Sequence, residues 1–182
     1  KAARVIKYRT NSKLETERDH TIYKGYASGF GDLIEYINGQ LPMNEIIDTA
    51  LRKEVRMYPE IVIRELVANA LIHQDFNQTG TSVMIEIFSD RVEITNLGQP
   101  LITADRFLDA YQPRNEKLAD IMRRMGICEE KGSVIDKVVL NTEYYQLPAP
   151  DVRIKPYHTT VMLFAYKDFE LIVIDDNSTD GT

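Results

Sequence analysis

The segment 65–75 constrains this chain most; it reads Glu-Leu-Val-Ala-Asn-Ala-Leu-Ile-His-Gln-Asp. Glu65, Asn69 and His73 are four residues apart, so on a helix they share one face. The other directions are mostly apolar, through Ile61, Ile63, Leu66, Val67, Ala68, Ala70, Leu71 and Ile72. A helix that is apolar on nearly every side is normally buried, and burying a carboxylate or amide without a partner costs free energy. The polar stripe therefore predicts a site for water, a metal ion or a ligand.

Flanking residues support a helix followed by a hairpin. Tyr58-Pro59 marks the helix start, with Pro59 expected at the first helical position, and Glu60 suits the first turn. The segments that follow are a group of turn formers (75–80), an alternating strand (82–88), a two-residue turn (Ser89-Asp90), a second strand (91–95) and a glycine-bearing turn (96–100).

This order of motifs resembles the GHKL, or Bergerat-type, ATP-binding fold of gyrase-type topoisomerases, histidine kinases and MutL. More narrowly, it is similar to the ATPase-like module of transcriptional regulators and RecG-related ATP-dependent helicases. The resemblance covers roughly residues 30 to 166. The motifs that carry it are 58–60, 73–75 and 91–96, continued by Pro113-Arg114-Asn115, Arg123-Arg124-Met125-Gly126-Ile127 and Glu129-Glu130-Lys131-Gly132.

The resemblance implies roles for single residues. Glu65 matches the carboxylate that polarises the attacking water, and Asn69 matches the Mg²⁺ ligand, consistent with the preference of Mg²⁺ for oxygen. Asn96 stands where an acidic residue usually accepts the adenine amino group, and its side-chain oxygen can accept the same bond. Gly98 would let the backbone approach the base. The remaining residues placed at the nucleotide by the resemblance are His73, Asp75, Arg114, Gly132 and Thr160.

One position departs from the family pattern. A glycine pair normally forms a lid whose backbone N–H groups hold the phosphates. Gly132 matches the first glycine, but Val134 stands where the second is expected. Because a β-branched residue tolerates positive φ poorly, this departure puts nucleotide turnover in doubt.

Each motif also has a plainer interpretation. Glu65 and Asn69 are also consistent with a satisfied polar pair at a domain interface. His73 is consistent with a structural histidine, Asp75 with a residue that caps the following turn, and Gly132 with a connector before a helix. The order of the motifs favours descent from a nucleotide-binding protein. It does not indicate that this chain still hydrolyses nucleotide.

The remaining segments complete an expected two-layer α/β sandwich, with a mixed, mostly antiparallel sheet and helices on one face. We expect a strand at 3–10, a charged loop at 15–19, and a helix at 30–38 that stops at Gly39. Residues 45–57 are ambiguous between helix and strand, and the resemblance favours an extended strand. Later segments predict helices at 103–111, 115–126 and 133–145, then a closing hairpin at 151–157 and 159–166. The second of these helices should bury a stripe made of Leu118, Ile121, Met122 and Met125.

The division expected for the chain is a preceding domain or linker (1–27), the GHKL ATPase-like domain (28–169) and a tail (170–182). Residues 171–182 resemble a strand and turn of family-two glycosyltransferases, but no room remains for the rest of such an enzyme. We interpret them as an extra strand with an acidic end, or as a piece foreign to the module. A chain starting at Lys1 without an initiating Met suggests a fragment of a longer protein.

Composition limits the function classes. The net charge of −6 disfavours nucleic-acid binding by the module itself, so DNA contact is expected through other domains of the full-length protein. No segment is long enough to span a membrane, and the single cysteine, Cys128, suits a cytoplasmic protein. We therefore predict an ATP- and Mg²⁺-binding regulatory module, with weak ATPase activity and homo-oligomerisation left open. The alternative is a degenerate interaction or dimerisation module that has lost nucleotide turnover.

Overall fold

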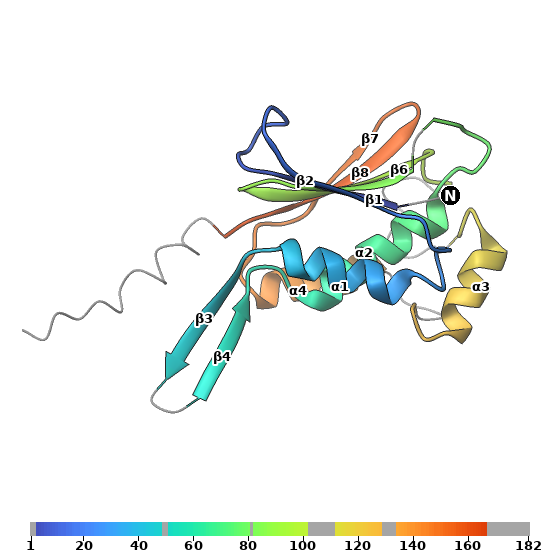
Figure 1. Cartoon of the computed structure of the whole chain (residues 1–182). Coiled ribbons are helices and arrows are strands. Elements are labelled where there is room, and N and C mark those ends of the chain that lie inside the picture. Colours follow the sequence, from blue (N-terminus) through green and yellow to red (C-terminus); the bar gives the residue numbers. More distant parts are fainter. Residues whose placement is uncertain (1–2, 49–50, 81, 102–111, 129–133, 167–182) are drawn as a thin grey trace, which may run out of the picture.

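The computed structural model describes residues 3–48, 51–80, 82–101, 112–128 and 134–166. Its main sheet has six strands in the order β2-β1-β5-β6-β8-β7. In the described residues, the helices lie on one face of this sheet (Figure 1). The strands of the sheet are β1 (Ala3–Tyr8), β2 (Thr16–Ile22), β5 (Val83–Ile87), β6 (Arg91–Leu97), β7 (Asp151–Ile154) and β8 (His158–Phe164). The helices are α1 (Phe30–Gln40), α2 (Glu60–His73), α3 (Glu116–Arg124) and α4 (Val134–Tyr144).

The sheet is mixed and mostly antiparallel, as predicted. Only the β1–β5 pair of this sheet is parallel, and the other described pairs are antiparallel. The register aligns Val5 with Ile85, Ile85 with Ile94, and Ile94 with Val161, so one apolar row crosses four strands. This row faces the helices and forms the floor of the core.

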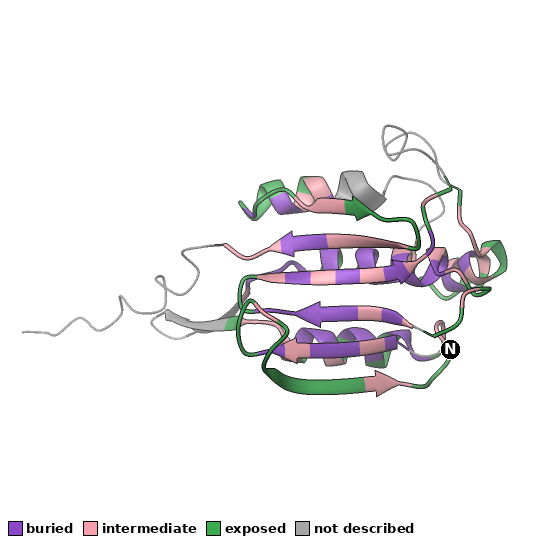
Figure 2. Ribbon diagram, turned by 90° about the horizontal axis from the view of Figure 1, so that it is seen from above, coloured by how far each residue is buried: buried purple, intermediate pink, exposed green. Residues whose placement is uncertain are grey.

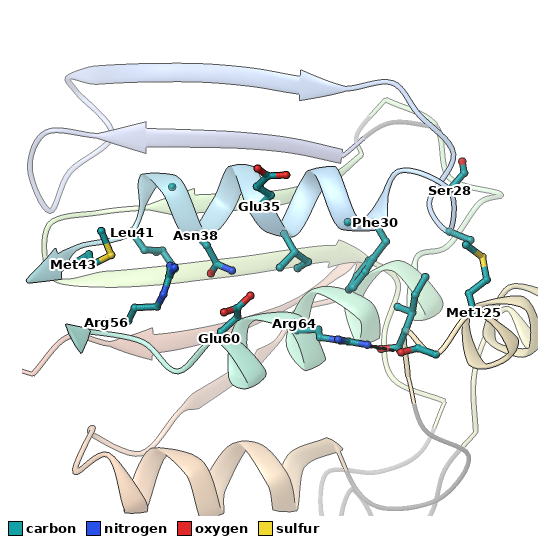
Figure 3. Close-up of a pocket in the computed structure, with 16 residues that line it drawn as sticks. Ser28, Phe30, Glu35, Asn38, Leu41, Met43, Arg56, Glu60, Arg64 and Met125 are labelled. Carbon is teal, nitrogen blue, oxygen red and sulfur yellow. Dashed lines mark hydrogen bonds between the residues drawn. The ribbon is translucent and has the colours of Figure 1, made fainter. Parts of the chain in front are cut away.

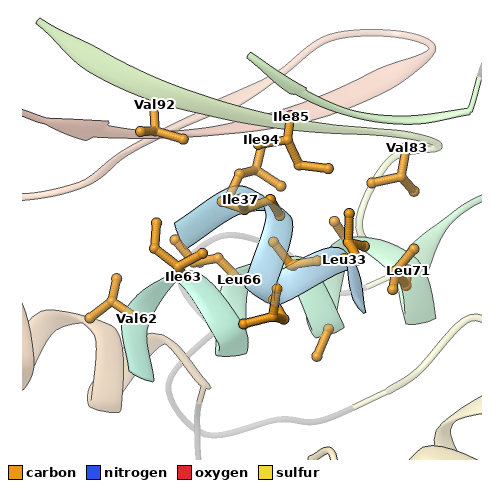
Figure 4. Packing of buried hydrophobic residues seen from close by; sticks show 14 of the residues in the cluster. Leu33, Ile37, Val62, Ile63, Leu66, Leu71, Val83, Ile85, Val92 and Ile94 are labelled. Carbon is orange, nitrogen blue, oxygen red and sulfur yellow. The ribbon is translucent and has the colours of Figure 1, made fainter. Parts of the chain in front are cut away.

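The core lies between that row and the inner sides of α1 and α2. Figure 4 shows Leu33 and Ile37 of α1 and Ile63 and Leu66 of α2 packed beneath the sheet residues, among them Ile94. Full burial of a side chain of this kind contributes roughly 1.5–3 kcal/mol. The helix α2 is buried on most sides, although Ile61, expected to be covered, is 41% exposed.

The prediction for α2 is confirmed, with one adjustment at its start. Pro59 is the N-cap, with an extended backbone at φ −60° and ψ 131°, and not the first helical residue. The helix predicted at 30–38 is confirmed and extends to Gln40, and the helix at 133–145 and the closing hairpin are also confirmed. The extended segment at 45–57 is a two-stranded sheet of its own, formed by β3 (Met43–Asp48) and β4 (Leu51–Arg56). The helix predicted at 103–111 and the tail from residue 170 lie outside the described residues.

Two local predictions were wrong. The charged segment 15–19 is not a loop, because residues 16–19 belong to β2, which pairs with β1. In α3 the predicted apolar stripe is only partly buried: Met122 is 0% exposed, but Ile121 and Met125 are 49% and 54% exposed. The covered face of α3 is formed by Ala119 and Met122 because this helix meets the core over a narrow area.

The first two strands belong to the same sheet as the rest. β1 lies between β2 and β5, and Val5 is part of the main core. Figure 2 shows β2 as the exposed edge next to it. The division of the chain into domains stays a prediction, and this position of β1 favours a domain that includes residues 3–27.

Candidate functional site

The polar stripe of α2 is a mixture of buried and half-buried side chains. Glu65 is 5% exposed, while Asn69 and His73 are of intermediate exposure. Cys128, which follows α3, lies close enough for the charge of Glu65 to affect it. Burial and then the charge of Glu65 raise the pKa of the Cys128 thiol. The buried carboxylate therefore lies where α2 meets the end of α3.

His73 is held in its neutral form at physiological pH. Burial, and then the positive charge of Arg114, lower the pKa of His73 to about 4. A neutral imidazole has one nitrogen that accepts a hydrogen bond and one that donates. At neutral pH His73 therefore adds no positive charge to this site.

Three side-chain amides hold the C-terminal end of α2. Asn115 Nδ2 donates to the carbonyl oxygens of Ile72 and Gln74, each at 2.7 Å. Asn96 Nδ2 donates to the carbonyl oxygen of His73 at 3.3 Å, and Gln74 Oε1 accepts from the Leu97 N–H at 2.9 Å. The last carbonyls of a helix have no partner within the helix, so the two asparagine amides supply the donors that the backbone lacks.

The sequence analysis did not predict that Gln74 and Asn115 form hydrogen bonds at the end of α2. Both stood inside recognised motifs, next to His73 and Arg114, but no role was assigned to them. Gln74 is 0% exposed, which is unusual for a glutamine. A long polar residue just after an apolar helix, followed later by an asparagine in a Pro-Arg-Asn motif, is the signal that was available.

Gly98, Arg114 and Asp75 form a tight cluster beside that helix end. Gly98 has φ +101°, and a Cβ atom added there would lie 3.2 Å from Arg114 Nε and 3.2 Å from Asp75 Cβ. Arg114 Nη2 donates to the Gln99 carbonyl oxygen at 2.7 Å, and Arg114 Nη1 lies 3.8 Å from Asp75 Oδ2. Glycine is favoured at this turn, because the positive φ strains an L side chain and the neighbouring side chains would have to shift to admit a Cβ atom.

Asp75 also caps the turn after α2. Its Oδ1 accepts from the Asn77 N–H at 2.9 Å and its Oδ2 accepts from Gln78 Nε2 at 3.0 Å. This is the structural role that the plainer interpretation assigned to Asp75. The carboxylate therefore orders the turn and faces Arg114 at the same time.

Thr160 is not brought together with the other predicted site residues. It pairs with Thr95, and the two hydroxyl oxygens are 2.9 Å apart. Side chains alternate between faces along a strand, and Asn96, next to Thr95, faces α2, so Thr160 lies on the opposite face of the sheet. Thr159 is the threonine on the α2 side, and its Oγ1 donates to the Gly98 carbonyl oxygen at 2.9 Å.

Of the two positions where lid glycines are expected, 132 and 134, the second is part of the described structure. Gly132 lies outside the described residues. Val134 is the first residue of α4, so the position where the family has its second glycine is the start of a helix here.

The chemistry of the cluster fits an anionic ligand with a cation held by oxygen atoms. Among the described residues, Arg114 Nε is buried without a hydrogen-bond partner, which a phosphate oxygen would supply. Glu65 and Asn69 offer carboxylate and amide oxygens, which Mg²⁺ prefers. The part of the chain that the structure describes has no group of three His, Cys, Asp or Glu side chains placed to hold a metal ion by themselves. None of its helices is long and apolar enough to cross a membrane.

Known proteins resemble the chain in two ways. Residues 80–163 match the family described as "Putative ATP-dependent DNA helicase recG C-terminal". The fold is similar to the crystal structure of the DIP2311 protein from Corynebacterium diphtheriae, with a TM-score of 0.79 and 19% sequence identity. That match covers 91% of this chain and 35% of the other, so the chain spans about a third of that protein's length. At this identity the likeness shows the fold alone. No curated protein matches the chain.

The family match covers β5, β6, α3, α4, β7 and most of β8, and begins after α2. It therefore includes Gly98 and Arg114 but not the polar stripe of α2. The match of residues 80–163 to a RecG-related family agrees with the ATPase-like module that the motifs predicted.

Proposed function

We propose that this chain binds ATP with Mg²⁺ and acts as a nucleotide-dependent switch in a DNA-linked regulatory protein. The main support is the link between the family-matched segment and the polar stripe of α2. The Asp75 N–H donates to the Leu97 carbonyl oxygen at 2.9 Å, and Asn96 donates to the carbonyl of His73. These bonds hold the Gly98 turn against the end of the helix that carries Glu65 and Asn69.

Each residue has a role in this proposal. Glu65 would polarise the attacking water as a general base, and Asn69 would offer an oxygen to the cation. Arg114 would donate a hydrogen bond to a phosphate oxygen, and the Gly98 turn with Asn96 would contact the base. When bound, Mg²⁺ neutralises charge on the phosphates. His73, Asp75 and the lid around Gly132 would complete the surroundings of the nucleotide.

The wider setting of the proposal follows the resemblance. The full-length protein would act in the cytoplasm. Its other parts would contact DNA, because this chain has a net charge of −6, which disfavours binding to phosphates. Hydrolysis would be weak, because Val134 replaces a lid glycine. Homo-oligomerisation would be one way to transmit the bound state.

Calorimetry with ATP and Mg²⁺ tests binding. We expect the wild type to bind and Asn69→Ala to lose at least tenfold in affinity in the presence of Mg²⁺, which is about 1.4 kcal/mol. Asn77→Ala, in the exposed turn after α2, is the matched control and should bind like the wild type. Absence of binding by the wild type would reject the nucleotide switch.

Hydrolysis needs a separate measurement. Glu65→Gln keeps the shape of the buried side chain but removes its basicity, so affinity should stay while any phosphate release falls by about 10²–10⁴-fold. Unchanged turnover in Glu65→Gln would contradict the general-base role.

A second candidate is an interaction or dimerisation module that has kept the fold without turnover. The start of α4 at Val134 supports it, because a β-branched residue replaces the expected glycine there. Light scattering with and without ATP separates the candidates. A dimer that forms equally well without nucleotide, together with no measurable binding of ATP, would favour the second.

A further inference from the structure

A cavity of about 710 Å³ lies between α1, α2 and the loop after α3 (Figure 3). Its volume is in the usual range of small-molecule sites, about 300–1,000 Å³. None of the residues predicted to bind nucleotide lines it. The α2 residues that do line it, Glu60 and Arg64, are four apart and form a different stripe from Glu65 and Asn69.

Asn38 gives this cavity a buried polar atom with nothing to bind. The residue is 8% exposed, and its Oδ1 has no hydrogen-bond partner in the part of the chain that the structure describes. Figure 3 shows its side chain pointing from α1 toward Glu60 at the start of α2. An unsatisfied buried acceptor costs free energy and so destabilises the fold. A ligand with an N–H donor would remove that cost.

The cavity has a polar end and an apolar end. Figure 3 shows Arg56, Asn38 and Glu60 gathered at one end, and Phe30 and Met125 at the other. The apolar lining continues through Ile34 and Ile127, which are 8% and 7% exposed. The side chains of Glu60 and Met125 are exposed, so a ligand can enter from solvent.

Arg64 does not contribute a charge to a ligand, because its guanidinium is already engaged. Its Nε donates to the Ile127 carbonyl oxygen at 3.3 Å, and its Nη2 donates to the Gly126 carbonyl oxygen. The polar end therefore offers one cation, Arg56, the carboxylate of Glu60 and the acceptor of Asn38, whereas Figure 3 shows Glu35, the other carboxylate of the lining, pointing away from α2. These groups suit a ligand with both a positive and a negative charge at one end.

We propose that this cavity is a second binding site, for a zwitterion with an apolar body, such as an apolar α-amino acid. The ammonium group would donate to Asn38 Oδ1 and pair with Glu60, and the carboxylate would pair with Arg56. The apolar body would lie against Phe30, Met125 and Ile127.

Titration with L-phenylalanine, followed by ¹H–¹⁵N spectra, tests the proposal. We expect saturable shifts in α1 and α2 that are weaker with phenylethylamine, which lacks the carboxylate, and with hydrocinnamate, which lacks the ammonium. The dipeptide L-phenylalanyl-L-leucine, whose ammonium and carboxylate are on different residues, should bind more weakly than L-phenylalanine; tighter binding would contradict a site for a free amino acid. No shifts with any of these compounds up to about 10 mM would overturn the proposal.

Two variants separate binding from folding. Asn38→Leu should lose at least tenfold in affinity, yet melt higher by roughly 2–4 °C, because it removes the unsatisfied acceptor. Arg56→Met should weaken L-phenylalanine at least tenfold but leave phenylethylamine unchanged. Its control is Arg124→Met, on an arginine that is outside the cavity and 79% exposed. Wild-type affinity in both Asn38→Leu and Arg56→Met would refute the assignment.

Discussion

Asn96 and His73 are joined by a hydrogen bond in which Asn96 Nδ2 donates to the His73 carbonyl oxygen at 3.3 Å. The bond connects the last turn of α2 to the end of β6. The same Nδ2 donates to the Leu97 carbonyl oxygen at 3.0 Å, so the amide group is fixed in orientation. The residue that the resemblance places at a nucleotide base is therefore also part of the scaffold.

Removing the amide of Asn115 should destabilise the fold. Asn115→Ala would leave the carbonyls of Ile72 and Gln74 without this donor, at an expected cost of about 1–3 kcal/mol. Urea denaturation measures the change, with Asn77→Ala in the exposed turn expected to stay within about 0.5 kcal/mol. Equal stability of the two variants would mean that water replaces the amide without loss.

A side chain at Gly98 should also be costly. Gly98→Ala must hold a φ of +101° and bring its Cβ to 3.2 Å from Arg114 Nε, so we expect a loss of about 1–3 kcal/mol. Gly39→Ala, inside α1 with nothing within 4 Å of the added Cβ, should instead be neutral or stabilise by up to about 1 kcal/mol. Thermal melts of both variants check the contrast, which would vanish if the 96–100 turn could rearrange.

The stability of the fold should fall in mild acid because of His73. Burial lowers the pKa of His73 from 6.5 to about 4, so the unfolded chain binds more protons between these values. This contribution is present above about pH 6.5 and is lost as the pH falls toward 4, amounting to roughly 3 kcal/mol at most. Urea denaturation of wild type and His73→Gln from pH 7 to pH 4 measures it.

His20, which is exposed, provides the control for that series. His20→Gln should follow the wild-type pH dependence, whereas His73→Gln should show a shallower fall. Parallel curves for wild type and His73→Gln would show that the imidazole is not the group responsible.

A buried carboxylate on the other face of the sheet makes Lys13 more important than its exposure suggests. Glu86 is 4% exposed and accepts from Lys13 Nζ at 2.6 and 2.7 Å and from the Tyr8 hydroxyl at 3.0 Å. Lys13→Ala would remove the countercharge, so we expect a loss of about 2–4 kcal/mol at pH 7. The pair Lys24–Asp32 is exposed on both sides, and Lys24→Ala should change stability by at most about 1 kcal/mol. Similar unfolding midpoints for the two lysine variants would contradict the countercharge role.

The features that could be predicted from the sequence are those set by neighbouring residues. The helix α2 was predictable because Pro59, the apolar residues and the turn formers after it are all local signals. The β5–β6 and β7–β8 hairpins were predictable for the same reason, since alternation and turn residues lie close together. The spacing of Glu65, Asn69 and His73 followed from helical geometry alone.

The remaining features depend on contacts between distant segments. β2 looked like a charged loop because its partners, Arg4 for Asp19 and Lys7 for Glu17, come from β1. The face of α3 was misjudged because periodicity does not indicate how wide an area a helix buries. Asn115 bonds the Gln74 carbonyl 41 residues away, and the Gln74 side chain bonds Leu97, 23 residues away. The cavity at Asn38 is formed by α1, α2, β3, β4 and the loops next to α1 and α3.

The outer strands of the main sheet have a consequence for the behaviour of the protein in solution. β2 carries the charged residues Glu17, Arg18 and Asp19 on its exposed part, and β7 at the opposite border is only four residues long. An unpaired strand normally invites backbone pairing from another molecule, and charge or shortness discourages it. Both borders therefore disfavour the addition of a strand from another molecule, which limits growth of the sheet into aggregates.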